Sequence, residues 1–246
     1  MTDMDVHVIS LARSPDRLEA FQRSNAHLNR ARIFQGIDGR ELVRQDLIRD
    51  GVIAADLEYL PGALGCALSH RALWRVAAAP GGGVLTVCED DAVLHRDFEV
   101  KAAELIERLP PGWDAIMWTW NFDSSLAYEL VPDVSRCLAT FHPGVFSEGQ
   151  IERFQSVDVD ARAFRLLRSF GIACYTVSPK GARMLDAACF PLRPFLLPLS
   201  KQLILQNVGI DVAMARCYPQ ANVWVSIPPL ALPRHRKEAS TISAAR

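Results

Sequence analysis

The sequence has 246 residues, of which 50% are hydrophobic and 22% are charged, and its formal net charge is −1. This composition is typical of a folded globular protein and excludes intrinsic disorder, and the length suits one large α/β domain or two small ones. A net charge near zero gives no electrostatic basis for binding nucleic acid, so any basic groups that bind phosphate must be local.

Strands and helices alternate along the chain. In chain order we expect a strand at 6–11, a helix beginning at Pro15 after Ser14, a strand at 33–37, a helix at 62–79, a strand at 84–88, a helix at 98–109, a strand at 115–120, a strand at 172–177, a helix beginning at Pro179, a helix at 199–208 and a strand at 223–227. The segment 121–169 gives no clear pattern. The alternation predicts an α/β fold with a mostly parallel, twisted sheet and helices on both faces.

The sequence shows no domain boundary, secretory signal or membrane span. There is no internal repeat, low-complexity segment or linker, so we expect a single domain over 1–246 with a polar tail at 236–246. Residues 1–5 are acidic and lack the apolar core of a secretory signal, and no uncharged apolar run approaches the roughly 20 residues of a membrane span. The sequence therefore predicts a cytoplasmic location, with at most peripheral contact at the inner face of a membrane.

The six cysteines form no CxxC pair, and no His/Cys cluster has zinc spacing. Most of them stand in apolar surroundings, where a free cysteine behaves as a small buried hydrophobe. We therefore expect free thiols rather than disulfides.

Three acids, Glu89, Asp90 and Asp91, directly follow the predicted strand at 84–88. Because side chains alternate along a strand, Glu89 and Asp91 are expected to share one face while Asp90 points elsewhere. Clustered carboxylates repel each other unless a cation lies between them, and oxygen ligands suit Mg²⁺ or Mn²⁺. Such a site would stabilise a departing nucleoside diphosphate. A solvated acidic turn or helix cap is the alternative interpretation.

The segment from Gly62 to His70, with the sequence GALGCALSH, is followed by Leu73 and Trp74 and then by the strand that ends in the acids. This combination resembles glycosyltransferase family 25, which includes lipopolysaccharide, lipooligosaccharide and collagen-type galactosyltransferases. The segments 8–17, 37–39, 173–182, 210–211, 228–229 and 240–242 resemble further parts of the family pattern. The resemblance extends over most of the chain, with a gap at about 121–169.

The resemblance implies a GT-A-like fold, with a nucleotide-sugar-binding part at 1–120 and an acceptor-binding and catalytic part at 121–235. It implies that Asp91 is the principal metal ligand and that Glu89 contacts the metal or the ribose. The residues assigned to binding of the nucleotide-sugar donor are Arg13, Arg17, Asp38, Gly65, Ser69 and Asp90. Solvated surface is the alternative for both arginines, and a common Asp-Gly turn is the alternative for Asp38.

The predicted catalytic residues are Asp211 and His70. The resemblance implies an inverting transfer, which needs a carboxylate to receive the proton of the acceptor hydroxyl. Asp211 is the candidate base, because the resemblance implies an acid at this place after the helix from Pro179, and no helix-cap pattern competes for it. His70 is expected to orient the donor or to act on the acids, and a hydrogen-bonded core histidine is the alternative.

Five further residues are rivals or possible contributors. Asp158 and Asp160 alternate as on one strand face and are rival bases, although an exposed acidic strand is preferred. Trp118 and Trp120 are expected on one face of a strand, as core residues or as a platform for sugar stacking. His235, in a basic run from Arg234, is a possible metal ligand or part of a tail that touches diphosphate or anionic lipid.

The sequence thus predicts a metal-dependent, inverting glycosyltransferase. The expected cofactor is Mn²⁺ or Mg²⁺, the donor is a UDP-sugar with galactose as the leading choice, and the acceptor is a glycan such as lipopolysaccharide. Two alternatives are a degenerate nucleotide-sugar-binding protein and a metal-dependent phosphohydrolase, although the latter would need further metal ligands.

Overall fold

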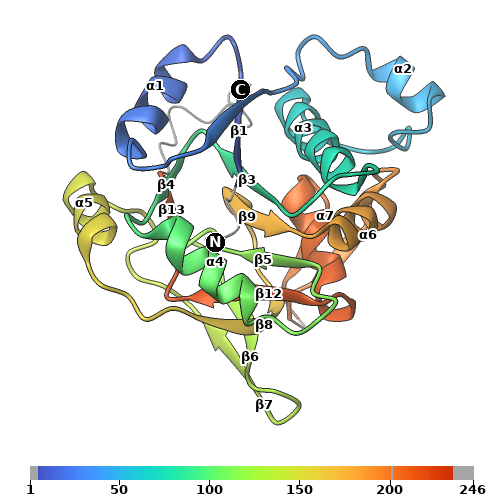
Figure 1. Cartoon of the computed structure of the whole chain (residues 1–246). Coiled ribbons are helices and arrows are strands. Elements are labelled where there is room, and N and C mark those ends of the chain that lie inside the picture. The colour runs from blue at the N-terminus through green and yellow to red at the C-terminus, as the bar shows by residue number, and fades with distance from the viewer. Residues whose placement is uncertain (1–4, 201, 235–246) are drawn as a thin grey trace.

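The computed structural model describes residues 5–200 and 202–234 of the chain. Its centre is a nine-stranded sheet, and two short two-stranded sheets accompany it (Figure 1). In chain order the elements are β1 (Val6–Ser10), α1 (Pro15–Ser24), β2 (Ala31–Gln35), α2 (Arg44–Arg49), α3 (Pro61–Ala78), β3 (Leu85–Glu89), β4 (Ala92–Leu94), α4 (Phe98–Glu107), β5 (Ala115–Met117), β6 (Leu126–Val131), β7 (Ser135–Ala139), α5 (Glu148–Ser156), β8 (Arg162–Arg168), β9 (Cys174–Val177), α6 (Pro179–Cys189), β10 (Leu196–Pro198), β11 (Ile204–Gln206), α7 (Ile210–Cys217), the 3₁₀ turn η1 (Tyr218–Gln220), β12 (Val223–Ile227) and β13 (Ala231–Pro233).

The large sheet has the strand order β2-β1-β3-β9-β5-β12-β8-β6-β7. β1 is parallel to both β2 and β3, and β5 is parallel to β12. β9 lies antiparallel between β3 and β5, and β8, β6 and β7 continue the sheet with antiparallel pairings. The predicted α/β class is confirmed, and the sheet is a mixed one. Strands from the two halves of the sequence are interleaved in it.

The two faces of the sheet carry separate apolar cores. On one face Val87 and Tyr175 pack in the core that α3, α6 and α7 cover. Their chain neighbours Cys88 and Cys174 point to the opposite face, which α1 and α4 cover. This is the period of two expected of strands that are buried on both sides. Figure 1 shows α3, α6 and α7 grouped together, away from α1 and α4.

Most of the predicted elements are present within a few residues of their expected bounds. The helix expected at 62–79 is α3, and Ser14 is the N-cap of α1 with Pro15 at the first helical position. All six cysteines are free thiols, as expected. The segment 121–169, which gave no pattern, contains β6, β7, α5 and β8.

Two structural expectations were wrong. The segment 199–208 is not a helix, because β11 pairs with β10 in an antiparallel hairpin. Leu197 and Leu205 pack against the core while Leu196 and Ile204 are exposed, so the apolar residues follow a period of two there. Trp118 and Trp120 do not share a face, because β5 ends at Met117.

The two tryptophans lie in different cores, Trp118 with α4 and Trp120 with the α3 side. Both are buried, which confirms their interpretation as core residues.

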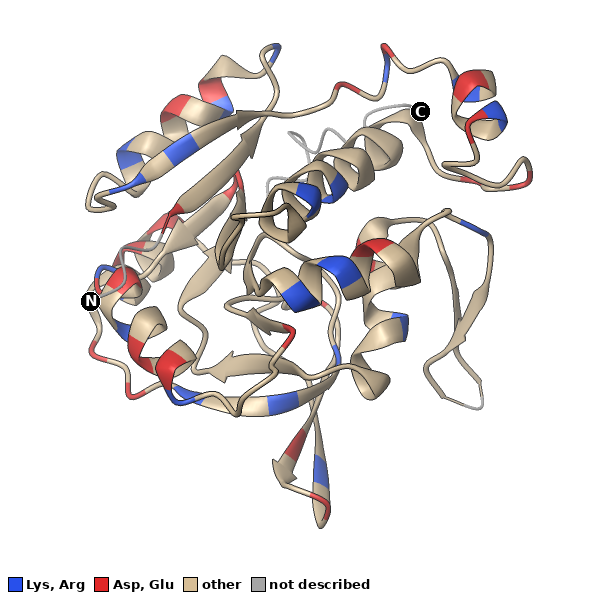
Figure 2. Cartoon of the chain, turned by 45° about the vertical axis from the view of Figure 1, so that its right-hand side comes forward, with Lys and Arg blue, Asp and Glu red and all other residues tan. Residues whose placement is uncertain are grey.

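Charges of both signs lie on the outer helices. Figure 2 shows basic and acidic residues on the same helices, and α1 carries Asp16, Arg17, Glu19 and Arg23. Within 5–200 and 202–234, no helix has both the length and the hydropathy needed to cross a membrane.

Close backbone contact fixes the position of α3. A Cβ atom on Gly65 would lie 2.4 Å from the carbonyl oxygen of Ile37 and 2.6 Å from the amide nitrogen of Gly39. A Cβ atom on Gly39 would lie 1.6 Å from the carbonyl oxygen of Pro61. The helix therefore rests on the loop that follows β2, and no side chain fits between them.

Gly65→Ala should lower the free energy of unfolding by roughly 1–3 kcal/mol, because the added methyl group overpacks a contact between backbones. Gly149→Ala in α5 is the matched control, since a Cβ atom there meets nothing within 4 Å. The control should leave stability unchanged or raise it by up to about 1 kcal/mol. Urea unfolding measures both variants, and equal midpoints would contradict the packing argument.

Candidate active site

A cavity of about 790 Å³ opens at the carboxyl ends of β1 and β3 and reaches the start of α7. The predicted site residues that line it are Arg13, Arg17, Ser69, His70, Glu89, Asp90, Asp91 and Asp211. Asp38 and Gly65 are not part of its lining. A cavity at this edge of an α/β sheet is where ligands of such folds bind.

The parallel pairing of β1 with β3 forms the centre of the site. Ile9 lies opposite Glu89, so the two strands end side by side. After β1 the chain continues into α1, and after β3 it continues into the turn that contains Asp90 and Asp91. This arrangement brings Arg17 to Asp90 across 73 positions of sequence.

Asp90 is held firmly at this edge. The hydroxyl of Ser10 donates a hydrogen bond of 2.9 Å to Asp90 Oδ2, and Arg17 Nε donates one of 2.7 Å to Asp90 Oδ1. The same guanidinium reaches Asp91, with 3.4 Å between Nη2 and Oδ2. Arg17 of α1 therefore pairs with Asp90 and also contacts Asp91.

Asp91 is the least compensated of the three acids. Although 29% of its side chain is exposed, burial raises the pKa of Asp91 to about 7, and the nearby charge of Glu89 adds to the rise. Among the described residues, its buried Oδ1 atom has no hydrogen-bond partner. An uncompensated carboxylate oxygen beside a second acid is a position that a divalent cation fits.

Glu89 points toward α3. His70 Nε2 lies 3.2 Å and Cys66 Sγ lies 3.7 Å from the same oxygen, Glu89 Oε1. Burial acts to raise the pKa of Glu89, but the hydrogen bond and charge of His70 outweigh it, so the pKa lies below its ordinary value.

His70 is fully buried, and its ring is held from both sides. Nδ1 lies 2.9 Å from the hydroxyl oxygen of Tyr175, which accepts a 2.7 Å hydrogen bond from Trp74 Nε1. The histidine is therefore both a hydrogen-bonded core residue and a contact of the acids.

Arg13 and Asp38 form a pair near one end of the cavity. Arg13 Nε donates a 2.7 Å hydrogen bond to Asp38 Oδ2, and Arg40 Nη2 lies 2.9 Å from the same oxygen. The hydrogen bonds from Arg40, followed by the charges of both arginines, hold the pKa of Asp38 well below its ordinary value. Asp38 also accepts the backbone N–H of Arg40, so it forms the turn that was its alternative interpretation.

Ser69 and Gly65 connect α3 to the loop after β2. Ser69 Oγ accepts the N–H of Ile37 at 2.8 Å and donates to the carbonyl of Gly65 at 2.7 Å. Both residues therefore shape the cavity wall through the backbone of that loop.

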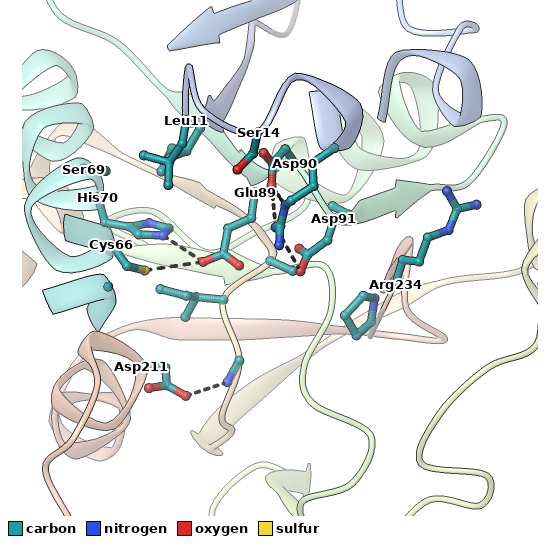
Figure 3. Close-up of a pocket in the computed structure, with 18 of the residues that line it drawn as sticks. Leu11, Ser14, Cys66, Ser69, His70, Glu89, Asp90, Asp91, Asp211 and Arg234 are labelled. Carbon is teal, nitrogen blue, oxygen red and sulfur yellow. Dashed lines mark hydrogen bonds and ion pairs between the residues drawn. The ribbon is translucent and has the colours of Figure 1, made fainter. Parts of the chain in front are cut away.

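Asp211 lies in a different part of the site. It stands in the first turn of α7, where Gly209 is the N-cap residue. Its carboxylate accepts the N–H of Gly171 at 3.1 Å and the N–H of Val212 at 2.9 Å, while burial raises its pKa. Figure 3 shows Asp211 apart from the three acids. Gly171 has a φ of +80°, a conformation that favours glycine.

The rival bases do not reach the cavity. Asp158 and Asp160 lie between α5 and β8 rather than on a strand, and their side chains are 95% and 86% exposed. Val157 is the C-cap of α5. The alternating Asp158 and Asp160 therefore lie in an irregular segment and not on one face of a strand. His235 and the tail at 236–246 lie outside the described residues.

Several lining residues were not predicted as site residues. They are Cys66, Asn121, Asp123, Gly171 and Arg234. Cys66 stands four residues before His70, so the two side chains share one face of α3. This spacing is a local signal that is visible in the sequence. The others are brought in by long-range folding. The backbone N–H of Arg234, for instance, donates a 2.7 Å hydrogen bond to the carbonyl of Asp91.

The mixed sheet and the acid-lined cavity at its strand ends define a candidate ligand-binding site. Residues 4–193 match the model of a family described as glycosyltransferase family 25 (LPS biosynthesis protein). The chain belongs to glycosyltransferase family 25.

Similar proteins include one of Acanthamoeba polyphaga mimivirus named "Putative glycosyltransferase", 29% identical over 48% of this chain and 37% of its own length. A Bos taurus protein named "Probable inactive glycosyltransferase 25 family member 3" is 31% identical over 46% of this chain and 21% of its own. A Homo sapiens protein named "Inactive glycosyltransferase 25 family member 3" matches to the same extent. The matches thus span a fifth to somewhat more than a third of these relatives.

The raised pKa of Asp91 predicts a pH dependence of stability. The folded protein holds the Asp91 proton more tightly than the unfolded chain, in which the pKa is about 3.9. In metal-free buffer the free energy of unfolding should therefore fall as the pH rises from about 4 through about 7. Asp91→Asn should remove much of this fall and be more stable than the parent at about pH 8.

Asp158→Asn, at an exposed acid outside the cavity, is the matched control and should follow the parent profile. Thermal melts in chelator across this pH range measure the effect. Parallel profiles for Asp91→Asn and the parent would contradict the assignment of the raised pKa.

Proposed function

We propose that the chain is an active, metal-dependent, inverting glycosyltransferase that moves a sugar from a UDP-sugar to a saccharide acceptor. The observation that carries the proposal is a single cavity with two sets of carboxylates, the acids after β3 and Asp211 at the start of α7. UDP-galactose as donor and lipopolysaccharide as acceptor rest on the family resemblance and on the family's description.

The acids after β3 suit the diphosphate end of the donor. Asp91 and Glu89 would hold Mn²⁺ or Mg²⁺, which would stabilise the charge that develops on the departing diphosphate. Arg17 lies against Asp90 and Asp91 and supplies a fixed guanidinium at the same place. His70 positions Glu89 through its hydrogen bond.

The remaining assigned residues suit the rest of the donor. Arg13 and Asp38 lie near the cavity end formed by α1 and the loop after β2, where they would meet the diphosphate and the base or ribose. Ser69 and Gly65 hold that loop in place. In this proposal the donor part is 1–120 and the acceptor part is 121–235, joined in one sheet.

Asp211 suits the acceptor end. Two backbone N–H groups fix its carboxylate, and burial makes it a stronger base than an ordinary aspartate. The acceptor hydroxyl oxygen attacks the anomeric carbon of the sugar as the bond from that carbon to the diphosphate breaks. Asp211 receives the hydroxyl proton, and the anomeric configuration inverts.

The names of the two mammalian relatives favour a second candidate, a protein that binds a nucleotide sugar without transferring it. Both candidates require donor binding, and only the first requires turnover. A panel of nucleotide sugars, assayed for transfer to saccharide acceptors with and without Mn²⁺, separates them.

UDP with Mn²⁺ should raise the melting temperature of the parent protein, because a ligand that binds only the native state stabilises it by mass action. Asp91→Asn should abolish both this shift and sugar transfer while remaining folded. Asp158→Asn should behave like the parent in both assays. A shift with GDP or CMP in place of UDP would contradict the donor, and full transfer in chelator would contradict the metal.

Asp211→Asn should lower the turnover rate by about 10²–10⁴-fold, the usual range for the loss of a general base. Its affinity for UDP with Mn²⁺ should barely change, because the residue lies apart from the acids after β3. Asp160→Asn should turn over like the parent. Near-normal turnover of Asp211→Asn, or a product of retained configuration by NMR, would contradict the mechanism.

A further inference from the structure

A second group of ligand-type side chains lies in the same cavity. Cys66 and His70 are one turn apart on α3 and so share a helix face, and Glu89 meets them from the end of β3. The thiol sulfur, the imidazole nitrogen and a carboxylate oxygen all lie within 4.8 Å of one another. Figure 3 shows Cys66 and His70 converging on Glu89.

The spacing of these atoms is close to that around a tetrahedral zinc ion. With Zn–S of about 2.3 Å and Zn–N or Zn–O of about 2.0–2.1 Å, neighbouring ligand atoms lie about 3.3–3.6 Å apart. The observed separations are 3.2 Å from His70 Nε2 and 3.7 Å from Cys66 Sγ to the same oxygen of Glu89. Two of the three separations thus lie within a few tenths of an ångström of those around one ion, and the third lies within 4.8 Å.

The surroundings of His70 also suit a metal ligand. A ligating histidine uses its second ring nitrogen to donate a hydrogen bond that fixes the ring. Tyr175 is in place to accept that bond at 2.9 Å from Nδ1, and Trp74 in turn holds the hydroxyl of Tyr175. In the metal-bound state the ring proton would be on Nδ1, and the lone pair of Nε2 would bind the ion in place of the hydrogen bond to Glu89.

We propose that Cys66, His70 and Glu89 form a binding site for a thiophilic divalent cation, with Zn²⁺ as the natural ligand class. On binding, the Cys66 thiol releases its proton to solvent and the thiolate bonds the ion. Thiolate and imidazole ligands select Zn²⁺ over Mg²⁺ and Mn²⁺. All three residues line the cavity, so the fourth coordination position faces it and is open to water or a ligand.

This site shares Glu89 with the proposed Mn²⁺ or Mg²⁺ site. An ion bound to Cys66, His70 and Glu89 would remove one ligand from the hard cation beside the diphosphate. Zn²⁺ is therefore an inhibitor of transfer at fixed Mn²⁺, a consequence that rests on the proposed function. The binding of the thiophilic ion itself does not rest on it.

Co²⁺ tests the site without nucleotide or acceptor. Titrated into the metal-free protein, Co²⁺ should give the absorption of a thiolate-to-cobalt charge transfer and the strong visible bands of tetrahedral cobalt. One equivalent of Zn²⁺ should bleach both. Cys66→Ser and Cys66→Ala should lose the charge-transfer band, and His70→Gln should weaken binding of Zn²⁺ by about 10–100-fold or more.

Cys137→Ser is the matched control, because Cys137 is a partly exposed thiol on β7 that does not line the cavity. It should keep the full signal. Melting curves establish that each variant is folded before metal is added. Two substitutions are made at Cys66 so that the test still holds if one of the two variants does not fold.

Absence of the charge-transfer band in the parent, its persistence in folded Cys66 variants, or its loss in Cys137→Ser would overturn the proposal. The outcome is separable from that of the proposed function. A protein that shows the band but transfers no sugar contradicts only the proposed function. One that transfers sugar with Mn²⁺ but shows no band contradicts only the thiophilic site.

Discussion

Three consecutive carboxylates at the end of a buried strand are the constraint on which the rest of the site depends. Like charges this close are unstable in a partly buried position unless each finds its own compensation. Asp90 is compensated by Ser10 and Arg17, and Glu89 is compensated from α3 by His70. Asp91 keeps an oxygen without a partner among the described residues, and burial together with the charge of Glu89 raises its pKa. The acid with the least compensation is the one that most favours a bound cation.

The helix α3 links packing to chemistry. Its N-terminal half can approach the loop after β2 only because Gly65 and Gly39 lack side chains. That approach places Ser69 against the loop backbone, and the next residue, His70, against Glu89. Stability and electrostatics are thus coupled on one helix. A substitution that shifts α3 would change the environment of the acids without touching them, so measurements on this helix need a stability control.

The mixed sheet explains how two ends of one cavity come from distant parts of the chain. β9 runs antiparallel between β3 and β5, so the residues just before β9 lie beside the end of β3. Glu89 accordingly donates its backbone N–H to Ala173 at 2.8 Å. Gly171, two residues earlier, holds Asp211. The position of Asp211 relative to the acids after β3 therefore follows from the placement of β9, antiparallel, between β3 and β5.

The sequence by itself determined the α/β class, most of the strands and helices, and the placement of the acids at a strand end. Those features are local: the period of apolar residues, the turn residues that stop it and the charges that follow are all visible within a few positions. The family pattern around Gly62–His70 also lies within one short stretch and its following strand.

Tertiary structure alone decided that Arg17 pairs with Asp90, that Cys66 joins His70 and Glu89, and that Asp211 opens a helix against Gly171. It also decided the strands of 121–169 and the pairing of β10 with β11, where buried and exposed apolar residues are mixed. The physical reason is the same in each case. A sequence pattern records how each residue is buried by its own element, whereas these contacts depend on which distant element lies opposite, and that is set only when the whole sheet has assembled.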